Sequence, residues 1–202
     1  MTPLSENITA LYERHAHAWA EERGSDLVLE KQWLDSFISL VPEGATILDV
    51  GCGSAEPIAK YLIEKGFEVS GVDASPTMIS MCRSRFPQNE WMVGDMRRLS
   101  LGRTFQGLIA WDSFFHLSHD AQRGMFPIFR QHLLAGAPLM FTSGPAHGEA
   151  IGTYRGEPLY HASLDAAEYR SLLAANGFAV VKHVTGDPEC GGHTVWLAQL
   201  QQ

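Results

Sequence analysis

Apolar segments and polar breaks alternate along the chain from residue 46 onward. Five apolar runs have the length of buried strands, and they lie at 46–50, 67–72, 90–93, 105–111 and 138–142. Four segments with helical character lie between or after them, at 58–65, 76–86, 121–134 and 165–176. Repeated strand–helix–strand units of this kind predict an α/β fold with a doubly wound, mostly parallel sheet and right-handed crossovers.

The two ends of the chain follow other patterns. Near the N-terminus, the pattern of residues 3–24 predicts a helix that stops at Gly24. The pattern of residues 26–40 predicts a second helix, capped by Ser25 or Asp26. We therefore expect a helical cap over residues 1–43, joined as one structural unit to a domain over 44–202. Near the C-terminus, 178–184 and 194–200 are consecutive strands without a helix between them, which predicts an antiparallel hairpin at the sheet edge and a total of seven strands.

One long segment, 143–163, shows no clear period and is rich in Gly and Pro. Loops of this length without regular structure are usually functional or disordered, so we expect an irregular substrate loop here. It follows the fifth strand, which places it on the ligand side of a doubly wound sheet. Its Tyr154, Arg155 and Tyr160 suit a lid over a small polar or anionic molecule.

Composition narrows the class of protein. The 202 residues are 45% hydrophobic and 19% charged, which is typical of a globular domain. The net charge of -8 argues against a nucleic-acid partner, since neutralising phosphates requires clustered Lys and Arg. The three cysteines form no CxxC pair, and we see no signal peptide or membrane-spanning run. We therefore expect a cytoplasmic protein without a membrane partner, and the sequence leaves its oligomeric state open.

A glycine turn follows the first predicted strand. Asp49 ends the strand, and Gly51, Cys52 and Gly53 form the turn before the first parallel-sheet helix. The two glycines allow a backbone path and a close ligand approach that a Cβ atom would block. A dinucleotide site would need a third Gly or Ala at position 56, where this chain has Glu56. A carboxylate there would repel a pyrophosphate at the helix N-terminus, so the turn favours a ligand without phosphates.

Polar residues also follow the next three strands, and all of them fall on the ligand side of the sheet. They are the triplet Asp73-Ala74-Ser75, the triplet Gly94-Asp95-Met96 and the pair Trp111-Asp112. A carboxylate at position 73 can accept two hydrogen bonds from a ribose diol. Asp95 and the Met96 amide have the groups needed to read adenine, and the segment at 111–112 can hold an amino group of the ligand. The sequence therefore predicts an adenosine-containing ligand.

From Ile47 to Leu117 the chain resembles the class I S-adenosylmethionine-dependent methyltransferases of the small-molecule type. The resemblance implies S-adenosylmethionine as cofactor, with Asp49, Gly51 and Gly53 on the glycine motif and Asp73 on the ribose. It implies that Asp95 and Met96 contact the adenine. It also implies that Trp111 and Asp112 correspond to the family's segment after the fourth strand. This chain has Ala55 where the family commonly has Gly.

Members of the family often cover the cofactor with an N-terminal helix. The resemblance therefore makes Tyr12 and Trp19 candidates for an aromatic face against the sulfonium. Both also suit simple packing of this helix onto the domain, and that alternative stays open.

Methyl transfer needs a base only where the acceptor must lose a proton. His116, His147, Glu149, His161 and His193 are candidates near the ligand side, and we expect His116, His147 and Glu149 to be catalytic. No His, Cys and carboxylate spacing marks a metal site, so none is predicted.

The expected function is transfer of a methyl group to a small-molecule acceptor by in-line displacement. An NAD-dependent oxidoreductase is one alternative, because it shares the glycine turn and Asp73. A non-catalytic sensor of S-adenosylmethionine is another. The sequence identifies neither the acceptor nor the accepting atom.

Overall fold

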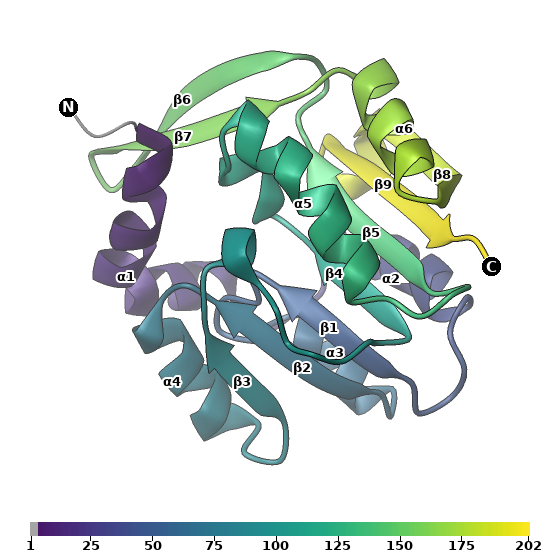
Figure 1. Ribbon diagram of the computed structural model, residues 1–202. Coiled ribbons are helices and arrows are strands. Elements are labelled where there is room, and N and C mark those ends of the chain that lie inside the picture. Colours follow the sequence, from purple (N-terminus) through teal and green to yellow (C-terminus); the bar gives the residue numbers. More distant parts are fainter. Residues whose placement is uncertain (1–3) are drawn as a thin grey trace.

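The computed structural model describes residues 4–202, so Pro3, the expected first helical residue, lies outside the described residues. A twisted seven-stranded sheet with helices on both faces forms the body of the molecule (Figure 1). Its strand order is β3-β2-β1-β4-β5-β9-β8. The strands are β1 (Thr46–Val50), β2 (Glu68–Asp73), β3 (Glu90–Val93), β4 (Gly107–Ala110), β5 (Pro138–Ser143), β8 (Phe178–Asp187) and β9 (His193–Leu200). The predicted seven-stranded, doubly wound sheet is confirmed.

The first five strands are parallel, and β9 pairs antiparallel with both β5 and β8. The predicted C-terminal hairpin is therefore present at the sheet edge, with its last strand inserted beside β5. Two apolar clusters, one on each face of the sheet, form the core. The helices are α1 (Leu4–Arg23), α2 (Lys31–Ile38), α3 (Ile58–Glu64), α4 (Pro76–Arg85), α5 (His119–Gln131) and α6 (Ala166–Ala175). Helices α5 and α6 cover one face, and α2, α3 and α4 cover the other.

The second helix is shorter than the sequence predicts. We expected it to begin at Asp26 under a Ser25 or Asp26 cap, but α2 begins at Lys31 after Glu30. The Glu30 side chain is buried, accepts a hydrogen bond from the backbone N–H of Leu29 and pairs with Arg23. This ion pair with the end of α1 holds the segment before α2 in a non-helical path.

The expectation of an irregular loop at 143–163 is wrong. Strands β6 (Gly148–Tyr154) and β7 (Glu157–Ser163) pair over seven residues and form an antiparallel hairpin apart from the main sheet. Its two-residue turn, Arg155-Gly156, has φ values of 49° and 83°, the left-handed conformation that joins hairpin strands most readily. The hairpin extends over the carboxyl ends of the parallel strands and contacts α1 (Figure 1).

Within residues 4–202, none of the helices combines the length and the apolar character needed to cross a membrane.

Candidate active site

The glycine turn between β1 and α3 is held from the neighbouring strand. The backbone N–H of Gly51 donates to the carbonyl of Val72 at 2.7 Å. The Asp73 carboxylate accepts from the N–H of Gly53 at 2.9 Å and from the N–H of Ser75 at 2.8 Å. Asp73 therefore shapes the turn and the start of α4, whose first backbone groups it helps to position.

Only glycine satisfies the backbone and the space at both turn positions. Gly51 and Gly53 have φ values of 79° and 52°, which side chains rarely adopt. A Cβ atom on Gly51 would lie 2.2 Å from the Cβ of Ser113, and one on Gly53 would lie 3.0 Å from the Trp19 ring. The turn thus presents bare backbone to the space between α1 and the sheet.

That space is a cavity at the carboxyl ends of the strands. All fourteen residues predicted for the cofactor line it. They are Tyr12, Trp19, Asp49, Gly51, Cys52, Gly53, Asp73, Ala74, Ser75, Gly94, Asp95, Met96, Trp111 and Asp112. The structure therefore brings together four strand ends and one N-terminal helix, as the sequence pattern requires of a single ligand site.

Two carboxylates, the buried Asp49 and the partly buried Asp73, give this cavity a preference for positive charge. Burial, with a smaller contribution from the neighbouring Asp73, raises the pKa of Asp49 to about 7. Burial also raises the pKa of Asp73, although the N–H groups of Ser75 and Gly53 offset part of the effect. A cationic group placed beside these carboxylates would stabilise their ionised forms.

The cavity also offers an unpartnered donor. The indole N–H of Trp111 is buried and has no hydrogen-bond partner within residues 4–202, and the residue lines the cavity. Glu56 lines it too, with its charge offset by Arg85 at 3.0 Å. Two carboxylates and a free N–H donor fit a ligand that carries both a cation and an acceptor oxygen, as a zwitterionic amino acid does.

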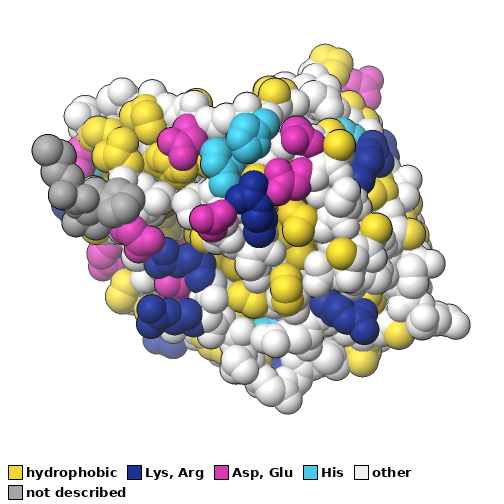
Figure 2. Space-filling view, turned by 45° about the horizontal axis from the view of Figure 1, so that its top comes forward, with side chains coloured by type: hydrophobic (Ala, Val, Ile, Leu, Met, Phe, Trp, Pro, Cys, Tyr) yellow, Lys and Arg dark blue, Asp and Glu magenta, His cyan; other side chains and the backbone are white. Residues whose placement is uncertain are grey.

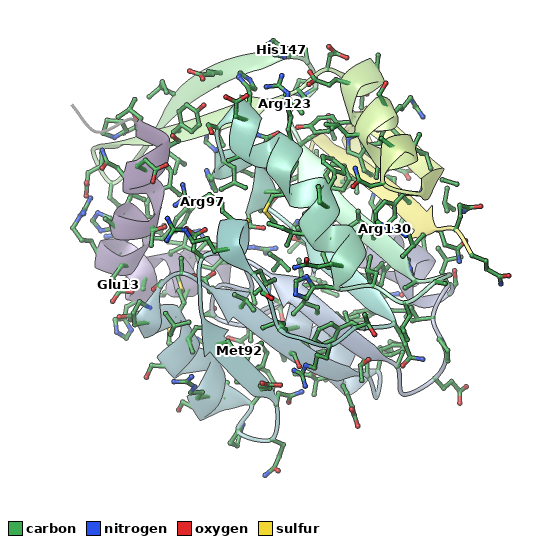
Figure 3. All side chains as sticks on the ribbon, in the orientation of Figure 1. Glu13, Met92, Arg97, Arg123, Arg130 and His147 are labelled. Atoms are coloured by element: carbon green, nitrogen blue, oxygen red, sulfur yellow. The ribbon has the colours of Figure 1, made fainter. Side chains whose placement is uncertain are left out.

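Helix α1 closes one side of the cavity. The Glu13 carboxylate accepts from the Ser75 hydroxyl and from the backbone N–H of Thr77, so it fastens α1 to the start of α4. On the other side, Arg14 and His15 bind Glu157 at the tip of the hairpin. Figure 3 shows Glu13 on the α4 side of α1 and Arg97 beside the cavity, where Arg97 binds Glu6 and Asp95. Polar contacts from three elements thus hold α1 over the site.

His116, one of the three expected catalytic residues, also lines this cavity. It ends the short 3-10 helix Phe114–His116 (η2) and is buried. Its Nδ1 lies 2.8 Å from the carbonyl of Tyr160, and its Nε2 lies 2.9 Å from the hydroxyl of Tyr12. A carbonyl accepts only, so Nδ1 carries the proton and Nε2 accepts from Tyr12. Burial lowers the pKa of His116 to about 4, which keeps the ring neutral.

His147 and Glu149, the other two expected catalytic residues, lie outside this cavity. They line a second cavity between the β5–β6 loop, the hairpin and the turn before β9, together with Phe115, His161 and His193. His147 is exposed and stacks on His119 with ring centroids 4.6 Å apart. Figure 3 places it at the outer edge near Arg123, and Figure 2 shows histidine side chains gathered among acidic and basic ones on this face.

Asp112 and His193 form a charged pair between the two cavities. Asp112 lines the first and His193 the second, and Nε2 of His193 lies 3.1 Å from a carboxylate oxygen. The backbone of Asp112 has a φ of 47°, and its N–H donates to the Thr142 hydroxyl at 2.8 Å. Mainly through the Asp112 carboxylate, the pKa of His193 rises to about 9.

The sequence of residues 47–136 matches the family model described as a methyltransferase domain. Over 117 residues the chain is 30% identical to a dTDP-3-amino-3,4,6-trideoxy-alpha-D-glucopyranose N,N-dimethyltransferase of Streptomyces venezuelae, a match that covers 56% of this chain and 49% of that protein. Both similarities support the class I S-adenosylmethionine-dependent methyltransferase that the sequence resembles. Another relative, a dTDP-3-amino-3,6-dideoxy-alpha-D-glucopyranose N,N-dimethyltransferase of Streptomyces fradiae, is 34% identical over 82 residues, which are 40% of this chain and 32% of that one. The chain thus spans about half or less of the length of these curated relatives.

Solved structures share the fold at lower identity. An amino pentose methyltransferase from Micromonospora echinaspora, with S-adenosylmethionine bound, has a TM-score of 0.70 at 19% identity, covering 91% of this chain and 95% of that one. A Burkholderia thailandensis 1,6-didemethyltoxoflavin-N1-methyltransferase has a TM-score of 0.73 at 17% identity, with coverage of 98% and 88%. At these identities the likeness is one of fold.

S-adenosylmethionine is the cofactor of the family, and the donor set of the first cavity fits it. The ligand has an ammonium, a carboxylate, a sulfonium and a ribose, and it has no phosphate. The carboxylates of Asp49 and Asp73, a free indole N–H and bare glycine backbone are the matching protein groups.

The sequence analysis missed Glu13 and Ser113. The Glu13 carboxylate accepts from the Ser75 hydroxyl, and the Ser113 hydroxyl donates to the carbonyl of Val50. These contacts join segments that are 62 and 63 residues apart in the chain.

Proposed function

We propose that this protein transfers a methyl group from S-adenosylmethionine to a small-molecule acceptor. The observation that carries the proposal is the convergence of all fourteen predicted cofactor residues on one cavity, with a second cavity directly beside it. The first cavity supports cofactor binding, and the second supports an acceptor site on the far side of Asp112 and His116.

Bound S-adenosylmethionine supplies a methyl group on a positively charged sulfur, which is already activated for displacement. The task of the protein is then to align the acceptor and to exclude water. Asp49 and Trp111 are placed to hold the amino acid part, and Asp73 has one lone pair left on each oxygen for the ribose diol. Tyr12 and Trp19, on α1, would cover the bound cofactor.

A small-molecule acceptor is supported by the two curated relatives, which are N,N-dimethyltransferases of dTDP-linked amino sugars. The cytoplasmic location, the absence of a nucleic-acid partner and the division at residue 43 stay predictions. An NAD-dependent oxidoreductase is disfavoured by the match of residues 47–136 to a methyltransferase domain. A sensor that binds the cofactor without turnover remains the second candidate, because the same cavity would serve it.

Calorimetry with S-adenosylhomocysteine tests the cofactor assignment. We expect micromolar binding to the wild type and a loss of about 100-fold in Asp73→Ala, because two charge-assisted hydrogen bonds to the ribose disappear. Asp26→Ala, at an exposed position, is the matched control and should bind like the wild type. Binding of NADH in place of S-adenosylhomocysteine would overturn the proposal. Formation of S-adenosylhomocysteine with a panel of amines, phenols and thiols separates an enzyme from a sensor.

A further inference from the structure

Two histidine rings lie against each other in the wall between the two cavities. His116 lines the first cavity and His161 lines the second, with ring centroids 4.8 Å apart. His161 comes from β7 and His116 from η2, so the contact joins the hairpin to the segment after β4. An acceptor in the second cavity would therefore meet the His161 ring on its way to the cofactor.

The other imidazoles on this wall have no free nitrogen to take a proton. Both nitrogens of His116 are engaged, one by the Tyr160 carbonyl and one by the Tyr12 hydroxyl. In His193, Nδ1 lies 2.7 Å from the carbonyl of Cys190 and Nε2 lies beside Asp112, so both nitrogens donate. His193 is therefore a cation at neutral pH, and a cation cannot act as a base.

The two expected catalytic groups of the hairpin segment are also less suitable than His161. One oxygen of the Glu149 carboxylate accepts the Tyr160 hydroxyl at 2.8 Å, and the side chain is more than half exposed. His147 lies at the rim, where one of its nitrogens is within 4.8 Å of carboxylate oxygens of Asp165 and Glu168. Its place is on the outer side of the second cavity, away from the wall shared with the first.

The surroundings of His161 keep it neutral and positioned. Its ring packs against Phe115 at 5.3 Å and over Gly152, where an added Cβ atom would lie 3.7 Å from Cε1. Within residues 4–202 the hydrogen-bond partners of the ring are the backbone carbonyls of Leu159 and Ala150, and no side chain engages it. Burial lowers the pKa of His161, and these carbonyls and the Asp112 carboxylate offset only part of the effect.

We propose that His161 is the general base that takes a proton from the methyl acceptor in the second cavity. This inference rests on the proposed methyltransferase function. The acceptor then carries an N–H, O–H or S–H group. Its lone pair forms the new bond to the methyl carbon while the carbon–sulfur bond breaks and leaves its electron pair on sulfur. The acceptor proton passes to the imidazole, which becomes a cation and later releases the proton to water.

The first test compares His161→Gln with His147→Gln, which removes an imidazole from the rim of the same cavity. Each variant is assayed with whichever amine, phenol or thiol of the panel the wild type methylates. We expect His161→Gln to lower kcat at least about 100-fold with a KM near that of the wild type. At saturating S-adenosylmethionine, where the pH dependence of cofactor binding does not affect the rate, the rate of His161→Gln should also no longer fall on the acid side of the pH profile. Equal effects in the two variants, or an unchanged pH profile, would overturn the proposal.

A second test needs no acceptor. Among histidines, diethyl pyrocarbonate modifies those whose imidazole is neutral and accessible, and mass spectrometry of the protein loaded with S-adenosylhomocysteine locates the modified residues. We expect rapid modification of His161, comparable to the exposed His17, and protection of His116 and His193. Resistance of His161, or modification that begins only above pH 7, would refute its role as a base.

The same samples separate the two proposals. Calorimetry of both variants with S-adenosylhomocysteine should give affinities within about twofold of the wild type. If the wild type does not bind this ligand, the proposed function fails. If the ligand binds and His161 is unreactive, only the base assignment fails.

Discussion

We expect Asp49 to make cofactor binding depend on pH. The side chain is 3% exposed at the end of β1, and its pKa of about 7 lies well above the usual value near 4 for an aspartate. The ammonium of the cofactor pairs only with the ionised carboxylate. Binding therefore selects the ionised form, and lowering the pH through 7 should weaken binding because Asp49 must first lose a proton.

The magnitude follows from the ionised fraction. With a pKa of about 7, Asp49 is ionised in about 90% of free molecules at pH 8 and in about 10% at pH 6. The affinity for S-adenosylhomocysteine should fall roughly tenfold between these values, which is about 1.4 kcal/mol. Below pH 6 it should continue to fall by about tenfold per unit until the carboxyl group of the complex itself titrates.

Calorimetry from pH 5.5 to 8, in two buffers of different ionisation enthalpy, measures both the affinity and the protons released. We expect release of nearly one proton per ligand at pH 6 and almost none at pH 8. Asp49→Asn should bind weakly at pH 8 and show little dependence on pH, whereas Asp26→Asn should follow the wild type. Affinity that is flat or that rises as the pH falls in the wild type would refute the assignment of Asp49.

The same shift in pKa has a consequence for stability with the opposite sign. Asp49 ionises less readily in the folded protein than in the unfolded chain, because burial raises its folded pKa. This lowers the free energy of unfolding of the free protein; the effect is absent below pH 4 and grows up to pH 7. A pKa of about 7 in place of the usual value near 4 corresponds to a loss of roughly 4 kcal/mol in the free energy of unfolding, as an upper value. Asp49→Asn should therefore raise the Tm of the free protein at pH 8 while it weakens ligand binding.

Two further substitutions test the walls of the cofactor cavity. Gly51→Ala should abolish binding of S-adenosylhomocysteine, because the new Cβ would lie 2.2 Å from Ser113. The affinity of Gly51→Ala, measured by calorimetry, is compared with that of Gly44→Ala. Gly44 has a similar positive φ and no atom within 4 Å of an added Cβ, so an equal loss of affinity in both variants would contradict the steric reason. Glu157→Gln should release α1 from Arg14 and His15 and speed dissociation of S-adenosylhomocysteine by about two- to fivefold in stopped-flow measurements at low salt. Glu43→Gln is the exposed control, and an unchanged dissociation rate in Glu157→Gln would show that the hairpin does not hold α1 closed.

The cofactor side of the site could be predicted because it depends on local sequence. A strand end followed by Gly51 and Gly53 fixes a turn within a few residues, and parallel strands bring Asp73 and Asp95 to the same sheet edge. Each of these positions can be predicted once the strand and its last residue have been identified. The strand-end part of the lining was therefore predicted without knowledge of any long-range contact, whereas Tyr12 and Trp19 came from the family resemblance.

The acceptor side could not be predicted in the same way. The hairpin was missed because Gly148, Gly152 and Pro158 interrupt the alternation that usually marks strands. Within a strand, neighbouring residues point to opposite faces. Pairing in the hairpin sets His161 opposite Ala150 and Glu149 opposite Ala162, so these two side chains start from opposite faces of the hairpin.

The hairpin acts on both cavities, and its substitutions should separate the two effects. Glu157 at its tip binds α1, which closes the first cavity, whereas His161 near its base lines the second. If the hairpin served only to cover an acceptor, Glu157→Gln would leave cofactor dissociation unchanged. If it served only to hold α1, His161→Gln would leave the methyl-transfer rate unchanged. Since Glu157 contacts α1 and His161 lines the second cavity, we expect Glu157→Gln to change dissociation and His161→Gln to change turnover.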